Sequence, residues 1–411
     1  MNSILNRMDT HYKALSSLRS TIEVDQLTSQ SGQTRQLQGK LVFLPKTPSR
    51  EMHTRMDWKL PRVEHLAVIG DSFTLYRPGL EMVIKDKIDN PESVSFAASA
   101  LSFGRISKVQ MKATYTIEYF GQEEITGKVP TWHLRLSPKP ASVNPLTELW
   151  VDANGMVRVA KISAKNGDTT TVRLIDIEKN IKMGLDDFRI SYHGSIKPVS
   201  AAVAEISLKR SLNTALTRMD NHHRSLSSIA ADINTDRSNF QLGDSDVSQG
   251  TLVLLPKKGW RQMYARIDWI KPRAENIAVI GDEYMLYKPN VNAVYRGKIS
   301  KVTTLDTSGG VLAFMGMSRV QIEKNYQVEL IDREKMSGGI RTARLRITPA
   351  SGKFKYADLW VDGAGMVRQV KVTETNNDTN SVLLYNIRKN IKVNADVFIM
   401  KVPKGAKIIK G

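Results

Sequence analysis

The sequence predicts an α+β protein made of two copies of one domain, each with a helix followed by a largely antiparallel β-sheet. Three observations support this prediction. Motifs recur at a nearly constant displacement, apolar residues change from a helical to an alternating spacing, and 411 residues suit two domains of roughly 200 residues. A hydrophobic share of 41% is typical of a globular chain, and no apolar run approaches the roughly 18 residues that a membrane-spanning helix needs.

The duplication is visible in short motifs that return 211 positions later. Residues 55–58, Arg-Met-Asp-Trp, return as Arg-Ile-Asp-Trp, and residues 67–71 return unchanged. Near the end of each copy the displacement is 210, because residues 149–152 return at 359–362. Solenoid repeats have periods of up to about 50 residues, so this pattern indicates the duplication of a whole domain. We place the two copies at residues 1–198 and 199–411.

Each copy opens with an amphipathic helix. In the second copy the apolar residues follow one another mostly at steps of three, four or seven, which predicts one long helix from Val203 to Ile233. The first copy has the same spacing from Ile4 to Leu18. Met1 aligns with Leu212, inside the helix, so we expect that a leader and earlier helical turns preceded it.

After each helix the apolar period becomes two, which predicts half-buried strands. Met52, Thr54, Met56 and Trp58 alternate with charged residues and a histidine. A hairpin is predicted over 66–76, where a Gly-Asp pair supplies the turn. An apolar insertion follows at about 90–106, and the second copy has a counterpart around 311–315. Helices gathered on one face of an antiparallel sheet give an α+β fold.

Taken in order, these motifs resemble the periplasmic outer-membrane lipoprotein carrier family, LolA with its acceptor relative LolB. The resemblance begins with the helix motif at 5–9, continues through the strands at 39–43 and 55–58 and the hairpin at 67–78, and reaches the ending at 398–406. It covers nearly the whole of both halves. It implies an open, strongly curved antiparallel sheet, a half-barrel, capped by the N-terminal helix and a short lid helix. The concave face of such a sheet holds acyl chains and catalyses no reaction.

The resemblance and the strand pattern together nominate lipid-binding residues on the concave face and on the lid. In the first copy they are Met56, Trp58, Leu66, Val68, Phe73, Leu75, Met82 and Ile84, with Phe96, Leu101 and Phe103 from the lid. In the second copy they are Ile267, Trp269, Ile277, Val279, Tyr284, Leu286 and Tyr295, with Leu312 and Phe314 from the lid. The same pattern is typical of ordinary core residues in a half-buried sheet, and that alternative stays open.

The resemblance also implies an arginine that holds the lid closed, in the loop after the strand at 39–44. Lys46 and Lys257 stand in this loop and are our candidates for the latch. Lysine lacks the planar donor fork of arginine, so a solvated loop cation is the alternative. No catalytic motif or metal-ligand spacing is found, since even the adjacent His222 and His223 point about 100° apart on a helix. We expect no enzyme, no cofactor and no metal.

Positive charge is the second informative feature of the chain. Residues 1–200 hold 27 basic and 21 acidic residues, a net charge of +6, and residues 201–411 hold 33 and 20, a net charge of +13. Such a field attracts anionic lipid surfaces, although a basic surface also serves solubility. A nucleic-acid partner is disfavoured because no binding motif or aromatic stacking platform is found.

The predicted function is the transport of lipid or lipidated protein across the periplasm, with an apolar groove in each domain. Acyl chains of lipids or lipoproteins are the expected partners. The alternative is an envelope protein-interaction or stress-sensing module of the same fold, in which the grooves are filled. A chain without cysteine suits an oxidising compartment, and a periplasmic location assumes that a leader is missing from this sequence.

Overall fold

The chain separates into two compact units, Met1–Ser207 and Leu208–Gly411, and each is described by itself. The computed structural model describes residues 1–30, 33–88, 107–140, 145–257, 262–298, 314–350 and 354–410. The division falls inside helix α4 (Ala201–Ser225). The boundary predicted between residues 198 and 199 lies shortly before this helix and stays a prediction.

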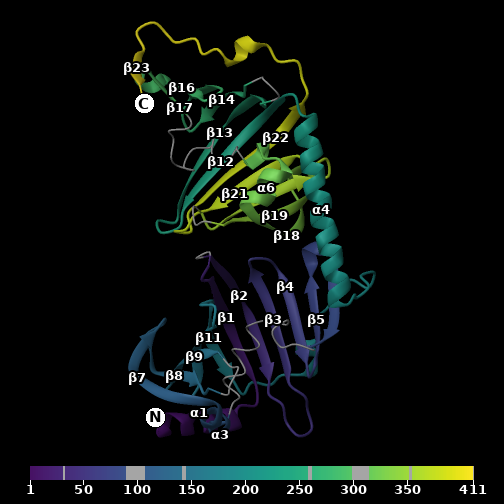
Figure 1. Cartoon of the computed structure of the whole chain (residues 1–411), viewed down its shortest axis with the longest axis vertical. Coiled ribbons are helices and arrows are strands. Elements are labelled where there is room, and N and C mark those ends of the chain that lie inside the picture. Colours follow the sequence, from purple (N-terminus) through teal and green to yellow (C-terminus); the bar gives the residue numbers. More distant parts are fainter. Residues whose placement is uncertain are drawn as a thin grey trace. The chain divides into compact units, whose positions relative to one another are not determined.

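The first unit is built on one bent sheet of eleven strands (Figure 1). The order β6-β5-β4-β3-β2-β1-β11-β10-β9-β8-β7 shows two meanders that meet where β1 pairs with β11. The edge strands β6 and β7 lie at opposite ends, so the sheet is not closed. The strands are β1 (Leu18–Thr28), β2 (Gln33–Leu44), β3 (His53–Leu60), β4 (Glu64–Ile69), β5 (Ser72–Arg77), β6 (Met82–Lys87), β7 (Tyr115–Ile125), β8 (Val129–Pro138), β9 (Leu146–Asp152), β10 (Val157–Ser163) and β11 (Thr169–Lys179).

The second unit repeats this order and adds one strand. At its outer edge β23 pairs in parallel with β17, at the place where the first unit has a single parallel bridge between Ile84 and Val199. The strands are β12 (Ile229–Asn239), β13 (Asp244–Leu255), β14 (Tyr264–Lys271), β15 (Glu275–Ile280), β16 (Glu283–Lys288), β17 (Ala293–Lys298), β18 (Tyr326–Lys335), β19 (Arg341–Pro349), β20 (Tyr356–Asp362), β21 (Val367–Thr373), β22 (Thr379–Lys389) and β23 (Lys407–Lys410).

Each unit has a helix before its first strand, α1 (Asn2–Ala14) or α4, and a short helix before its seventh, α3 (Lys108–Thr114) or α6 (Arg319–Asn325). Both short helices begin with the same capping box, in which a serine and the glutamine three residues later cap each other's backbone. Among the described residues, no helix is both long and apolar enough to cross a bilayer.

The predicted first helices were too long at their C-terminal ends. Ile229 begins β12 and Leu18 begins β1, so Ile233 also belongs to a strand. The physical reason is that a step of four residues fits two periods, one turn of a helix and two repeats of a strand. By contrast, the hairpin of β4 and β5 is confirmed, with Ile69 opposite Ser72 and Gly70 at φ +60° in the turn.

The core of the first unit lies on the face of the sheet that α1 covers. Ile4, Leu5 and Met8 of α1 are buried in one cluster with side chains from β1 to β4 and β7 to β11. The turn between β9 and β10 presses against the helix, because a Cβ atom at Gly155 would lie 2.3 Å from the carbonyl oxygen of Arg7. The second unit has the same contact between turn and helix, because a Cβ atom at Gly365 would lie 2.1 Å from the carbonyl oxygen of Arg218.

The opposite face of β3 is covered by the tail that follows β11. Arg55 donates hydrogen bonds to the carbonyls of Asp187 and Arg189, at 3.2 and 2.8 Å, and Phe188 packs edge-on against His53. Phe188 is 1% exposed. In the second unit Phe398 takes this place beside Tyr264, with ring centroids 5.5 Å apart. The tail therefore covers the outer face of β3 and of β14.

The coarse fold prediction is therefore confirmed, as two large bent antiparallel sheets with few helices in the part of the chain that is described. The finer expectation of a half-barrel with a helical lid stays a prediction.

Candidate functional site

An apolar row crosses one side of the first sheet from β2 to β6. Leu41, Met56, Leu66, Leu75 and Ile84 lie opposite one another in successive strand pairs. Residues directly opposite in antiparallel strands share a face, so all five side chains point to the inner side, where α1 lies. The alternating sequence pattern placed these residues on one face, and the register joins them into a row.

Burial divides the predicted lining residues of the first unit into two groups. Met56, Trp58, Leu66, Val68 and Ile84 are buried, and the first four belong to the cluster that includes α1. The second group, on the outer strands β5 and β6, is only half-buried, and it consists of Phe73, Leu75 and Met82. The half-buried apolar residues of this face therefore lie on the two outer strands, where Phe73 and Leu75 also pack against the core cluster.

The second unit has the corresponding row, from Leu252 through Ile267, Ile277 and Leu286 to Tyr295. Here only Ile267, Trp269 and Val279 among the predicted strand residues are buried. The half-buried ones are Ile277, Tyr284, Leu286 and Tyr295. The two units thus leave large apolar side chains half-buried at the same edge.

The predicted lid residues fall largely outside the described part of the chain. This holds for Phe96, Leu101, Phe103 and Leu312. Phe314 is described and is 2% exposed; its ring packs near those of Phe354 and Tyr326, with centroids 5.8 and 6.0 Å away. It therefore forms part of the core beside β21.

The two candidate latch lysines lie on the surface. Lys46 forms an ion pair with Glu51 of its own loop, at 3.1 Å, and more than half of each side chain is exposed. Lys257 is exposed as well. The role of a latch stays a prediction for both residues.

A charged group that sequence reasoning missed borders the apolar row of the first unit. Oε1 of Glu64 accepts a hydrogen bond from Nε of Arg62 and another from Nε of Arg77, both at 2.6 Å. Glu64 lies opposite Trp58, and Arg77 lies opposite Met82, so the group shares the face of the row. Burial lowers the pKa of Arg77, and the like charge of Arg62 lowers it further.

Sequence reasoning missed this group because arginine and glutamate on strands are typical of a solvated face. One signal was available, since Arg62 and Glu64 return as Arg273 and Glu275 in the second copy. The predicted hairpin brings β5, with Arg77, beside β4, but the burial of the three side chains around one oxygen depends on packing that no local pattern gives.

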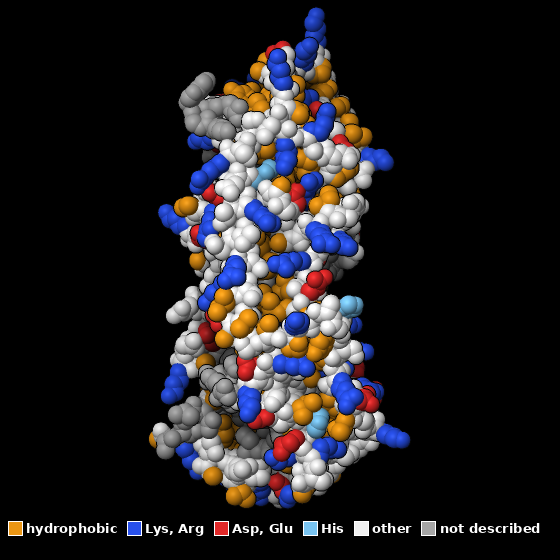
Figure 2. Space-filling model, turned by 90° about the vertical axis from the view of Figure 1, so that its right-hand side faces the viewer, with side chains coloured by type: hydrophobic (Ala, Val, Ile, Leu, Met, Phe, Trp, Pro, Cys, Tyr) orange, Lys and Arg blue, Asp and Glu red, His pale blue; other side chains and the backbone are white. Residues whose placement is uncertain are grey.

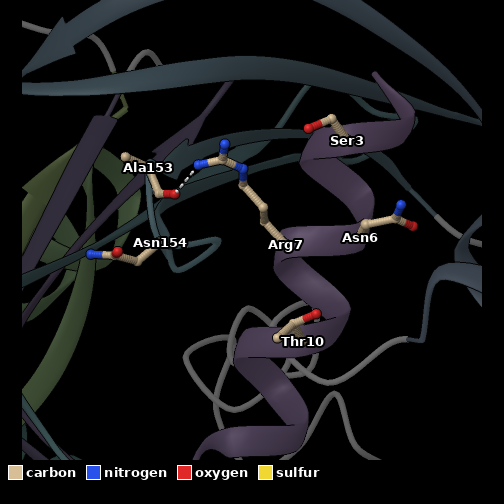
Figure 3. A pocket seen from close by; sticks show the side chains of 6 residues that line it. All are labelled: Ser3, Asn6, Arg7, Thr10, Ala153 and Asn154. Carbon is tan, nitrogen blue, oxygen red and sulfur yellow. Dashed lines mark hydrogen bonds between the residues drawn. The ribbon is translucent and has the colours of Figure 1, made fainter.

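A hollow of about 510 Å³ lies between α1 and the turn between β9 and β10 (Figure 3). Arg7 reaches across it and donates a hydrogen bond to the carbonyl of Ala153, at 2.8 Å. Five of its six lining residues have polar side chains, and the lining consists of Ser3, Asn6, Arg7, Thr10, Ala153 and Asn154. Such a lining does not suit an acyl chain.

Within the described ranges, no group of three or more His, Asp or Glu side chains is placed to hold a metal ion.

Residues 261–401 match the family described as outer membrane lipoprotein carrier protein LolA. The second copy is LolA-like. The match runs from the start of β14 past Phe398, so it includes most of the second apolar row. Because the first copy has the same motifs and the same strand order, the chain is a tandem duplication of a LolA-like domain. No curated protein matches the chain.

Several solved structures are similar to the chain. A LolA superfamily protein from Nitrosomonas europaea is 12% identical, with 46% of this chain and 97% of that chain covered and a TM-score of 0.26. The lipoprotein LppX from Mycobacterium tuberculosis is 13% identical, with 46% of this chain and 99% of that chain covered and a TM-score of 0.29. The Pseudomonas aeruginosa MucA/MucB complex is 10% identical, with 70% of this chain and 87% of that chain covered and a TM-score of 0.32. At identities of 10–13% and TM-scores below 0.5, these similarities carry no inference about function.

Proposed function

We propose that each LolA-like unit binds an acyl chain of a lipid or lipidated protein on its inner face and shields it from water in the periplasm, without catalysing a reaction. One observation carries the proposal. In both units an apolar row crosses five strands and reaches large side chains that are only half-buried, such as Leu75 and Leu286. The LolA match over residues 261–401 supports the same reading.

The energetics set what such a face must do. A chain of about 15 CH₂ groups gains roughly 12 kcal/mol when it is taken fully out of water. A carrier that covers only part of the chain keeps part of this gain, and the cargo can then leave for a membrane. Half-buried side chains at the sheet edge suit partial cover better than a closed core does.

The test is acyl uptake by the full chain after delipidation, measured with a fluorescent fatty acid and by native mass spectrometry. Leu75→Trp and Leu286→Trp add bulk where the row is half-buried, and each should reduce uptake by one equivalent. The matched controls, Leu27→Trp and Ile270→Trp, place the same ring at exposed positions of the same units. If the wild-type chain takes up no probe, or if both inner-face variants bind as the controls do, the proposal is wrong.

A second candidate is a protein-docking module whose grooves are filled by its own core. Met56, Trp58, Leu66 and Val68 favour it, because at most 4% of each is exposed within the first unit. This candidate predicts no acyl uptake by the first unit under the conditions above.

We also propose that the basic surface draws the protein to anionic membranes. Figure 2 shows one side of the molecule, on which Lys and Arg side chains are spread among hydrophobic ones and outnumber Asp and Glu. Binding to vesicles with an anionic phospholipid should weaken steeply as salt rises, while neutral vesicles should show no such dependence. Salt-independent binding would contradict this proposal.

A further inference from the structure

The inner face of the first unit has a charged end directly beside its apolar row. Successive strand pairs place Trp58 opposite Glu64, and Arg77 opposite Met82. Leu75 lies two residues before Arg77 on β5, so the same face changes from apolar to charged within one strand repeat. An amphiphile has this same sequence of apolar chain and polar head.

The charges at this end do not balance. Glu64 is the single acceptor for the Nε atoms of Arg62 and Arg77, and all three side chains are at most 17% exposed. Arg35, on the same face of β2, adds a third positive charge, which also lowers the pKa of Arg77. Buried charge is costly unless it is paired, and within the part of the chain that the structure describes Glu64 is the one carboxylate that pairs with Arg62 and Arg77.

The donor atoms that would bind an anion are not used by these ion pairs. Each arginine contacts Glu64 through Nε, and within the described residues the terminal nitrogens of Arg62 and Arg77 donate to no other group. Guanidinium nitrogens in this state bind a carboxylate or a phosphate with two parallel hydrogen bonds.

The second unit differs at the same positions. Lys288 replaces Arg77 and lies 3.4 Å from Glu275, while Arg273 is exposed. Asp246 stands where the first unit has Arg35. Arg237 lies directly opposite Asp246, so that carboxylate has its own cation. The second unit therefore differs from the first in its lysine in place of Arg77 and in the exposure of Arg273.

We infer that Arg62 and Arg77, held by Glu64 at the end of the apolar row, bind the anionic head group, a carboxylate or phosphate, of an amphiphile whose chain lies along that row. This inference rests on the proposed function and adds the class of cargo, an anionic amphiphile, to the first unit only. The second unit has no buried arginine pair at this place, so its acyl site lacks this preference.

The test compares a fluorescent long-chain fatty acid with its methyl ester on the full chain. The acid should bind one site at least about tenfold more tightly than the ester, as expected for charge-assisted hydrogen bonds. Arg77→Gln and Arg62→Gln should each remove this preference, and Arg77→Lys should weaken it because the fork is lost. The control Arg19→Gln removes one exposed charge from the same unit and should leave the preference unchanged.

The ratio of the affinities for acid and ester does not depend on the folded fraction, so this preference can be measured even for a partly unfolded variant. If the wild-type chain binds acid and ester equally, or if Arg77→Gln keeps the preference, the head-group site is wrong while acyl binding stands. If neither probe binds, the proposed function fails and the inference fails with it. Two competitors separate the sources of anion: displacement by lysophosphatidic acid supports a lipid head group, and equal displacement by inorganic phosphate would overturn it.

Discussion

Replacing Gly155 by alanine tests whether the β9–β10 turn fixes the position of α1 over the inner face. Gly155 has φ +81°, and a Cβ atom there would lie 2.3 Å from the carbonyl oxygen of Arg7 and 2.7 Å from the amide nitrogen of Met8. Both are backbone atoms of a helix, so no side chain can turn away to make room. Either the turn or the helix has to move.

The expected loss of stability has two parts. An alanine in the left-handed region costs about 1–2 kcal/mol, and forcing atoms into a packed contact costs about 1–3 kcal/mol more. Gly155→Ala should therefore destabilise the first unit by about 2–5 kcal/mol. Gly127→Ala is the matched control, because Gly127 has φ +84° and its Cβ would meet only a methyl group at 4.0 Å. It should cost only the first part, about 1–2 kcal/mol.

The assay is urea unfolding of the full chain, with hydrogen exchange of peptides from α1 as the local readout. Gly155→Ala should lower the unfolding free energy of the first unit and speed exchange in α1, and Gly127→Ala should leave α1 protected. Gly365→Ala against Gly338→Ala repeats the comparison in the second unit, since a Cβ atom at Gly338 would meet nothing within 4 Å. Equal losses for Gly155→Ala and Gly127→Ala would refute the reasoning.

Three further predictions concern the core and the response to pH. Met56→Ala removes a side chain with 0% exposure and should cost about 2–5 kcal/mol in urea unfolding. Burial opposes the charge of Glu148, but hydrogen bonding from Arg135 helps to hold its pKa below the ordinary value; the stability lost in Glu148→Gln should therefore be present at neutral pH and disappear as the pH falls below about 4. Burial lowers the pKa values of His11 and His222, so the stability of the wild-type chain should fall as the pH drops below about 6.5. Replacing both histidines by phenylalanine should make the melting temperature less dependent on pH in this range.

Much of the fold follows from patterns that are local in the chain. The displacement of 211 residues shows the duplication, and the alternation from Met52 to Trp58 predicts a strand with one apolar face. The Gly-Asp pair after Ile69 predicts the hairpin turn, because glycine adopts the positive φ that the turn requires. Each of these signals acts through the backbone or through near neighbours.

The ends of the helices and the cover of the sheet were beyond such patterns. Ile229 and Ile233 fit a helix and a strand equally well, and only the pairing of β12 with β13 decides between them. Phe188 and Phe398 are buried on the outer face, and each lies in the tail that follows β11 or β22 and packs back against the sheet. Each tail lies far along the chain from the strand that it covers, so no periodic pattern in the sequence predicts their contact.

The sequence by itself determined that a LolA-like domain occurs twice and that one face of its strands is apolar. Only the tertiary structure decided which apolar residues stay half-buried, because exposure depends on what another element covers and alternation reports only the side of the strand. The same holds for Arg62, Glu64 and Arg77. Their charges are visible in the sequence, and the predicted hairpin brings β4 beside β5. Only the tertiary structure shows that the three side chains are largely buried and meet at one acceptor oxygen at the end of the apolar row.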